Sequence, residues 1–177
     1  MNKEFKHQHW CDLTCQKFRE KEFSEEHLKR IAKSISLLKG TRETILELQK
    51  RGIKLYILSG SVKQIIRIVL GKVYDCFEEV RANNMVLDEQ GMLSKIEGTP
   101  FDFEGKAHFL KRLCDESGFP PPSVLFVGNS MNDSWARSTG VRTLCVNPHF
   151  TVPSNRAIWT DAIRTMEQMN EILQFVR

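Results

Sequence analysis

The stretch Val124-Leu125-Phe126-Val127-Gly128-Asn129-Ser130-Met131-Asn132-Asp133 decides the fold class of this chain. It opens with an apolar run of strand length that ends on Gly128. Two polar residues, Asn129 and Asp133, follow four positions apart, and a helical pattern then begins. Open α/β sheets bind their ligands at the carboxyl ends of buried strands. The stretch therefore predicts an α/β fold with a site for phosphate and metal chemistry at this strand end.

The segments around this stretch alternate between strand and helix patterns. Apolar runs rich in β-forming residues predict strands, and apolar residues at i, i+3 and i+4 predict helices. The predicted elements are strands over 53–58, 123–127 and 142–146, helices over 41–51, 62–70, 105–117, 131–139 and 165–176, and a hairpin over 80–96. Strands that alternate with helices imply right-handed crossovers and a mainly parallel sheet. We therefore expect a doubly wound, Rossmann-like α/β core.

The N-terminal part of the chain has a different composition. Residues 3–35 are rich in Lys, Glu and His and predict one or two charged helices, with Ser24 as an N-cap. No linker of low complexity separates them from the rest. We expect residues 1–38 to form a helical segment and residues 39–177 to form the α/β core.

Bulk composition excludes several classes of function. The chain has 177 residues, 41% of them hydrophobic, and a net charge of +4 with both signs interspersed. This gives no case for binding nucleic acid or a membrane surface. No apolar run approaches the roughly 20 residues of a membrane span. The odd number of cysteines, five, argues against a disulfide framework and favours reduced thiols in the cytoplasm.

Two short sites can hold phosphate. Ser59-Gly60-Ser61 follows a predicted strand and opens a helix, where a hydroxyl and unpaired N–H groups can bind an anion. Alternatively, Ser61 is only a helix N-cap. Lys106 lies in the first turn of its helix, a mildly unfavourable place for a cation that a neighbouring phosphate would explain. A solvated surface lysine is the alternative.

Asp133 has a structural reading beside its chemical one. Ser130-Met131-Asn132-Asp133 fits a capping box, and capping is compatible with metal binding. A second cluster, His7, His9, Cys11 and Cys15, contains residue types that bind zinc. Its spacing matches no common zinc motif, and a helix would spread the side chains around its circumference, so we expect no zinc site there.

Taken in order, these sites resemble motifs two, three and four of the haloacid dehalogenase (HAD)-type phosphatases, nearest to the phosphoserine phosphatase-like branch. Residues 41–61, TRETILELQKRGIKLYILSGS, resemble that branch's helix, strand and second motif. Arg81-Ala82-Asn83-Asn84 and the hairpin to Gly98 resemble its next segment. Gly105-Lys106 and residues 128–133 look like motifs three and four, and Val146-Asn147-Pro148 like the next strand end. The resemblance covers about residues 24–177.

This resemblance implies a Mg²⁺-dependent phosphomonoesterase. In the family an aspartate of motif one attacks phosphorus and forms an aspartyl-phosphate, and a second aspartate acts as general acid and base. On this template Ser59 and Gly60 would bind the phosphate. Lys106 would neutralise the phosphate and the nucleophile. Asn129 and Asp133 would orient Mg²⁺, directly or through water.

The chain departs from the family pattern at two places. Motif one, an apolar strand followed by Asp-x-Asp-x-Thr, is missing; the nearest match, Trp10-Cys11-Asp12-Leu13-Thr14, has Trp10 at the nucleophile position. Residues 3–35 look instead like the end of a cap, so we expect the first strand and its nucleophile on an upstream segment or another polypeptide. Asn129 replaces the usual first acid of motif four, which predicts weaker Mg²⁺ binding.

Three functions follow as hypotheses. The first is hydrolysis of a small phosphorylated metabolite, with a missing N-terminal segment or a partner in a homo-oligomer completing the site. The second is a catalytically silent HAD-like module that binds a phosphorylated ligand or a protein. The third, a receiver-like or nucleotide-binding domain, is weaker because the strand end at residues 58–60 lacks the G-x-G-x-x-G of dinucleotide folds.

Overall fold

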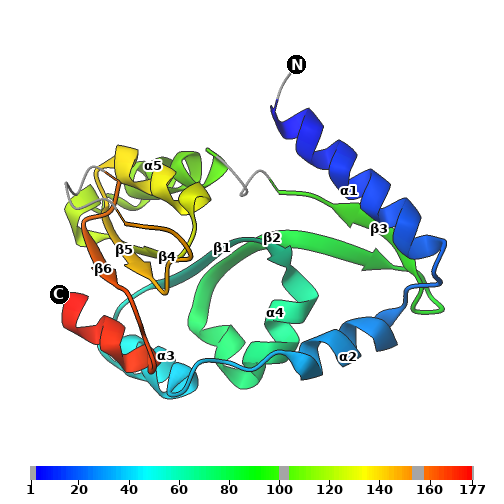
Figure 1. The fold of residues 1–177 in the computed structure, drawn as a ribbon, viewed down its shortest axis with the longest axis horizontal. Coiled ribbons are helices and arrows are strands. Elements are labelled where there is room, and N and C mark those ends of the chain that lie inside the picture. Colours follow the sequence, from blue (N-terminus) through cyan, green and yellow to red (C-terminus); the bar gives the residue numbers. More distant parts are fainter. Residues whose placement is uncertain (1–2, 100–103, 153–157, 177) are drawn as a thin grey trace. The chain divides into compact units, whose positions relative to one another are not determined.

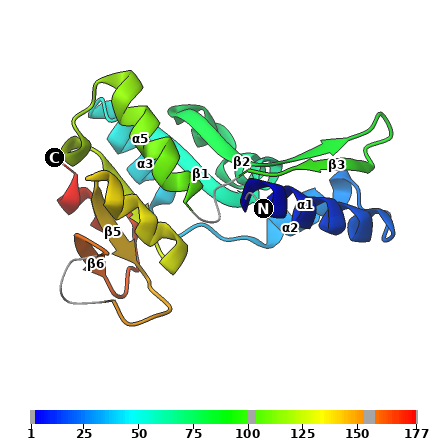
Figure 2. The same ribbon diagram turned by 90° about the horizontal axis from the view of Figure 1, so that it is seen from above.

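The computed structural model describes residues 3–99, 104–152 and 158–176. They form two compact units, one up to Phe101 and one from Asp102 (Figures 1 and 2). Three of the four strand pairings are parallel, as the α/β prediction requires. None of the helices in the described part of the chain is long and apolar enough to cross a membrane. The division into a 1–38 segment and a 39–177 core is not tested and stays a prediction.

The first unit contains a three-stranded sheet in the order β1-β2-β3. Strand β1 (Leu55–Val62) runs parallel to β2 (Phe77–Leu87), which forms an antiparallel hairpin with β3 (Leu93–Glu97). The hairpin confirms the prediction for residues 80–96. Its turn is built by Asp88, whose carboxylate accepts the backbone N–H groups of Gln90 and Met92, a local bond typical of Asp in turns.

Helices cover this sheet in two groups. The elements are α1 (Lys3–Arg19), α2 (Glu25–Ser34), α3 (Thr41–Lys50), α4 (Lys63–Leu70) and the 3₁₀ helix η1 (Gly71–Cys76). One apolar cluster joins α1, α2 and the β2–β3 hairpin, and another joins α3, α4 and η1. The predicted N-cap Ser24 is confirmed, because its backbone N–H donates to His27 Nδ1 in a capping box.

Helix α1 lies along the outer edge of β3 in both views of the fold. Its side chains bond to the edge backbone of that strand. Gln8 donates to the Ile96 carbonyl at 3.0 Å and accepts the Gly98 N–H at 3.0 Å, and the Cys15 thiol lies 3.6 Å from the Ser94 carbonyl. An edge strand needs such a cover, since its unpaired backbone groups can otherwise recruit another chain.

The second unit contains a parallel sheet in the order β4-β5-β6. Its strands are β4 (Leu125–Gly128), β5 (Arg142–Val146) and β6 (Asp161–Ile163), and its helices are α5 (Gly105–Ser117), η2 (Pro121–Ser123), η3 (Met131–Thr139) and η4 (Met169–Phe175). The predicted bounds of α5 and β5 are confirmed. Strand β6 was not predicted, and the helix expected over 165–176 is the shorter 3₁₀ helix η4.

The core of the second unit centres on β5. Val141, Leu144 and Cys145 have no exposed surface, and Thr143, equally buried, pairs its backbone and hydroxyl with those of Thr160. Burial raises the pKa of the Cys145 thiol, and Asp133 adds to the effect. The cysteines of the described residues carry no disulfide, which agrees with the expectation of free thiols.

Candidate active site

The predicted phosphate-binding residues Ser59 and Gly60 lie in a bulge of strand β1. Between the pairs Leu58–Arg81 and Val62–Asn83, β1 advances by four residues while β2 advances by two. Residues 59–61 therefore leave the regular ladder, and we call them the serine bulge. Bulges re-aim side chains and are frequent beside active sites.

A local hydrogen bond shapes the serine bulge. The Ser61 backbone N–H donates to Ser59 Oγ at 3.0 Å, which uses the acceptor side of this hydroxyl and leaves its proton to be donated outward. The prediction that Ser61 caps the next helix is wrong. Val62 is the N-cap of α4 and makes no side-chain cap bond, because the strand continues for two residues beyond Gly60.

Two amide side chains support the end of β1, and the motif analysis assigned no role to either. Asn83 Nδ2 donates to the Gly60 carbonyl at 2.6 Å. Gln64 donates to the Met85 carbonyl at 2.6 Å and accepts the Met85 N–H at 3.2 Å, so its amide continues the ladder where β1 has stopped. Strand β2 also carries Glu79, Arg81 and Asn84, so no sequence signal singles out Asn83 for this support.

The other predicted site residues lie in the second unit, where Lys106 and Asp133 form a buried ion pair. The Lys106 ammonium donates to Asp133 Oδ1, and the two side chains are only 12% and 6% exposed. Lys106 is the second residue of α5, and Asp133 lies in the first turn of η3 after β4. The alternative of a solvated surface lysine is therefore wrong.

Asp133 also stabilises its own loop through hydrogen bonds. Its Oδ2 accepts the backbone N–H groups of Asn129 and Ser130 and the Ser130 hydroxyl, each at 2.9 Å, which confirms the predicted capping box. Burial alone would raise the pKa of Asp133. Lys106 and the two backbone donors outweigh burial and lower that pKa, so the carboxylate stays charged.

Gly128 is required by the packing of this loop. A Cβ atom at Gly128 would lie 2.6 Å from Asp133 Cβ and 2.7 Å from its Oδ2. The carboxylate is held by four donors and has no room to yield. The glycine at the end of β4 thus allows the strand and the acid to approach each other closely.

The donor set of this loop fits a hard cation only in part. The Asn129 side chain is exposed and offers one amide oxygen, and both Asp133 oxygens already accept hydrogen bonds. Mg²⁺ prefers carboxylates together with waters and phosphate oxygens. Among the described residues no group of three or more His, Cys, Asp or Glu can hold a metal ion. A further carboxylate is needed to complete a Mg²⁺ site.

The same search bears on the N-terminal cluster of His and Cys. Cys11 and Cys15 are 7% exposed and belong to the apolar cluster under α1, whereas His9 is exposed. The absence of a zinc site at these residues stays a prediction. Trp10, at the nucleophile position of the nearest motif-one match, is 68% exposed in the middle of α1, so this match is no motif one.

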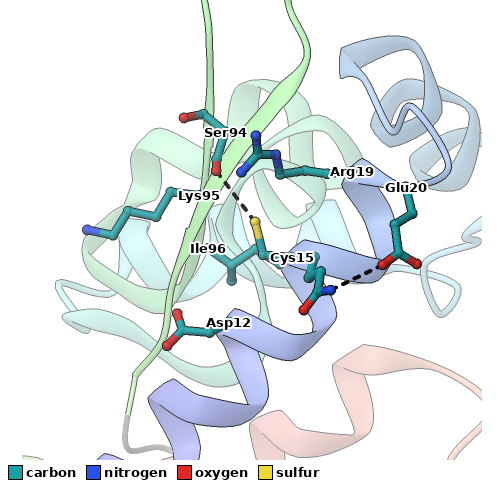
Figure 3. A pocket seen from close by; sticks show the side chains of 8 residues that line it. Asp12, Cys15, Arg19, Glu20, Ser94, Lys95 and Ile96 are labelled. Atoms are coloured by element: carbon teal, nitrogen blue, oxygen red, sulfur yellow. Dashed lines mark hydrogen bonds between the residues drawn. The ribbon is translucent and has the colours of Figure 1, made fainter.

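A groove of about 460 Å³ lies between α1 and the edge of β3 (Figure 3). It is lined by Asp12, Cys15, Gln16, Arg19, Glu20, Ser94, Lys95 and Ile96. Acidic and basic side chains share its rim, and Cys15 points to the Ser94 carbonyl. None of the predicted site residues lines this groove.

The second unit thus holds a largely buried lysine–aspartate pair after the end of a parallel strand, and the first unit holds the serine bulge near the end of β1. The family model described as haloacid dehalogenase-like hydrolase matches residues 15–134. The chain belongs to this family, which confirms the resemblance.

Two curated relatives are phosphoserine phosphatases. The enzyme of Archaeoglobus fulgidus is 26% identical over 111 residues, which is 61% of this chain and 31% of the relative. The phosphoserine phosphatase SerB2 of Mycobacterium tuberculosis is 26% identical over 103 residues, 58% of this chain and 25% of the relative. The chain therefore spans less than a third of the length of either relative.

Solved structures agree on the fold. A substrate-bound phosphoserine phosphatase complex matches with a TM-score of 0.70 at 21% identity, over 86% of this chain and 70% of that one. A phosphoserine phosphatase in the apo form also has a TM-score of 0.70, at 19% identity, over 99% of this chain and 90% of that one. The Rossmann-like α/β fold of the family is thus confirmed.

Proposed function

We propose that this chain carries the phosphate-binding part of a phosphomonoester hydrolase. The observation that supports it most is the buried pair of Lys106 and Asp133 in a member of this family. Burying a lysine and an aspartate costs several kcal/mol of desolvation each, which a structural role alone repays poorly. A site that must present a fixed positive charge to an anion gives a reason for that cost.

The residues of the chain divide the work of holding the phosphate. The Ser59 hydroxyl donates its proton to a phosphate oxygen, while its acceptor side is held by Ser61. The backbone at Gly60 approaches the same group closely because it has no side chain. Lys106 neutralises the negative charge that accumulates between phosphate and nucleophile, as preorganised cations do in phosphoryl transfer.

The nucleophile comes, in this proposal, from a segment outside the sequence of residues 1–177, which contains no Asp-x-Asp-x-Thr. Two strands can receive an added strand. Among the residues that the structure describes, β1 pairs only with β2 in its sheet, and β4 pairs only with β5 in its own. Their apolar residues are half-buried or exposed, unlike those of a fully covered parallel strand, and Val127 of β4 is 38% exposed.

A carboxylate at the end of that strand would also complete the metal site. Mg²⁺ would then take the Asn129 amide oxygen as a ligand, with Asp133 acting through water, and would offset the charge of the phosphate. In the chemical step the first aspartate of the added strand attacks phosphorus and the bond to the alkoxide breaks, while the second aspartate of that strand donates a proton to the leaving alkoxide and later regains one from the attacking water. Water then hydrolyses the aspartyl-phosphate, which returns the carboxylate and releases inorganic phosphate.

The names of the relatives support a proposal for the substrate class. Both curated relatives are named phosphoserine phosphatases, and we propose O-phosphoserine or a phosphomonoester of similar size as the substrate. In the family that this chain resembles, residues of the cap select the substrate, and α1 and α2 of this chain would be part of that cap.

The test is phosphate release from p-nitrophenyl phosphate and O-phosphoserine in the presence of Mg²⁺. The chain is compared with a version extended by an apolar strand that ends in Asp-x-Asp-x-Thr, and with the same strand added as a separate peptide. We expect release only when the strand is present. Lys106→Ala in the extended chain should lower the rate of phosphate release at least 100-fold.

Two results would go against this proposal. No release from any extended version, while inorganic phosphate still binds, would identify a phosphate-binding module without turnover. Release that is unaffected by Lys106→Ala would show that the buried pair has no part in the reaction.

A further inference from the structure

Asn83 connects three segments of the first unit at one buried point. It lies in β2 with 8% of its surface exposed. Its Nδ2 donates to the Gly60 carbonyl at 2.6 Å, and its Oδ1 accepts the backbone N–H of Thr99 at 2.7 Å. A carbonyl can only accept and a backbone N–H can only donate, so these two bonds fix the orientation of the amide.

Helix α1 reaches the same amide through His7. The distance from His7 Nε2 to Asn83 Oδ1 is 3.3 Å. Because an amide oxygen can only accept, Nε2 is the protonated nitrogen in this contact. Cys11 and Gly98 enclose the imidazole: Cys11 Sγ lies 3.7 Å from Nε2, and a Cβ at Gly98 would lie 2.8 Å from His7 Cδ2.

The serine bulge explains why an amide is needed at this point. Residues 59–61 leave the ladder between β1 and β2, so the Gly60 carbonyl has no strand partner in register. A buried carbonyl without a donor costs free energy comparable to a lost hydrogen bond. Asn83 supplies the donor from its side chain, one register position beyond the bulge.

We propose that Asn83 is a positioning residue that sets the geometry of the serine bulge according to the position of α1. His7 and Thr99 hold the amide oxygen, the amide nitrogen holds Gly60, and Gly60 adjoins the proposed phosphate-binding Ser59. Movement of α1 away from β2 removes one of the bonds that orient the amide, and the bulge then loosens. The inference rests on the proposed function only for the role of Ser59.

The experiment measures hydrogen exchange of the Ser61 amide, whose N–H is held by Ser59 Oγ inside the bulge. Asn83→Asp keeps the shape and the acceptor for Thr99 but replaces the donor to Gly60 by an oxygen. We expect the exchange of Ser61 to become at least tenfold faster. The amide of Val80, buried in β2 and outside the bulge, reports global unfolding of the unit; an equal acceleration at Val80 and Ser61 would overturn the proposal.

A second pair of variants tests the link to α1 if Asn83→Asp does not fold. His7→Ala removes the contact with Asn83, and Gln8→Ala removes neighbouring bonds between α1 and β3 without touching Asn83. We expect a threefold to tenfold faster exchange of Ser61 in His7→Ala and no change in Gln8→Ala. Equal effects in both variants would mean a general loosening of α1 and would overturn the proposed link from His7 through Asn83 to the serine bulge.

Exchange needs neither substrate nor metal, so its outcome is separate from that of the proposed function. Inorganic phosphate is then titrated into the unmodified chain and into Asn83→Asp. A fivefold or greater weakening supports the role of Asn83 at a phosphate site, and equal affinity contradicts it. If the unmodified chain binds no phosphate, the proposed function fails, and the exchange result alone decides whether Asn83 positions the bulge.

Discussion

The serine bulge of the first unit and the loop after β4 of the second unit are stabilised by different kinds of interaction. The serine bulge in the first unit is supported by neutral amides, Asn83 and Gln64, each of which replaces a missing strand partner. The loop after β4 in the second unit is supported by one buried charge pair, Lys106 and Asp133. Neutral hydrogen bonds contribute about 1 kcal/mol each, whereas an unpaired buried charge costs several. Substitutions and acid should therefore affect the second site far more than the first.

The largest effect is expected from Lys106→Ala. It leaves the Asp133 carboxylate buried without its cation, which should lower the free energy of unfolding by about 3 kcal/mol. Urea unfolding followed by the signals of the second unit measures this loss. The matched control is Lys111→Ala on the same helix, which removes the exposed pair with Asp115 and should cost at most about 0.5 kcal/mol. Equal losses in both variants would refute a special role of burial.

Gly128→Ala tests the same loop by crowding. The added methyl group would meet Asp133 at 2.6 Å, and the carboxylate cannot turn away without losing its donors. We expect a loss of about 2–3 kcal/mol in stability. In the first unit Gly98→Ala would press on the ends of the His7 and Cys11 side chains at 2.8 and 2.7 Å, which can shift, so about 1 kcal/mol is expected there. The reverse order, measured by thermal unfolding, would contradict this reading of the two sites.

Acid should lower the stability of the second unit more than that of the first. The pKa of Asp133 is lowered in the folded protein, so below the ordinary aspartate range the unfolded state binds the proton first. The stability that this carboxylate contributes is complete at pH 7 and is lost as the pH falls through and below the ordinary aspartate range. Urea midpoints at pH 7, 5 and 3.5 measure it, and Asp133→Asn should flatten the dependence of the second unit. The amides of the serine bulge do not titrate in this range.

The smallest effect on stability is expected from Asn129→Asp, because the side chain is exposed. The new carboxylate supplies a ligand that Mg²⁺ prefers, so we expect about tenfold tighter Mg²⁺ binding by calorimetry, or about 1.4 kcal/mol. Asn132→Asp, also exposed and three residues further along, adds the same charge outside the proposed ligand position and serves as the control. Equal gains in both variants would reduce the effect to charge alone.

The sequence predicted best where a local signal ends an element. Helix α5 was bounded correctly because Gly118 adopts a left-handed φ of +67° at its end, and the capping box of Ser130 and Asp133 marked the start of η3. Strand β6 was missed because three residues, one of them Asp161, carry no alternation to detect. Helix α4 begins at Lys63, one residue later than predicted, because β1 continues through its bulge to Val62.

The charged residues of the candidate site could be predicted from the sequence, whereas the amide side chains that support it could not. Lys106 and Asp133 belong to recognisable strand-end and helix-start positions, so their types and places indicate their chemistry. The role of Asn83 depends on a register shift between β1 and β2, which no short pattern in either strand encodes. The role of Gln64 also has no sequence signal, since a glutamine at the start of a helix does not indicate that its amide will bond to the backbone of Met85.

Strands β1 and β4 each lie at one end of their sheet in the described part of the chain, and this has a consequence for how the chain behaves at different concentrations. A half-exposed apolar edge strand pairs with any extended strand of suitable pattern, including the same strand of a second molecule. Self-pairing rises with the square of concentration, whereas pairing with a covalently attached strand does not depend on it. The chain alone should therefore be more self-associated in a concentrated sample than in a dilute one. The oligomeric state of a chain that carries its own added strand should not change on dilution.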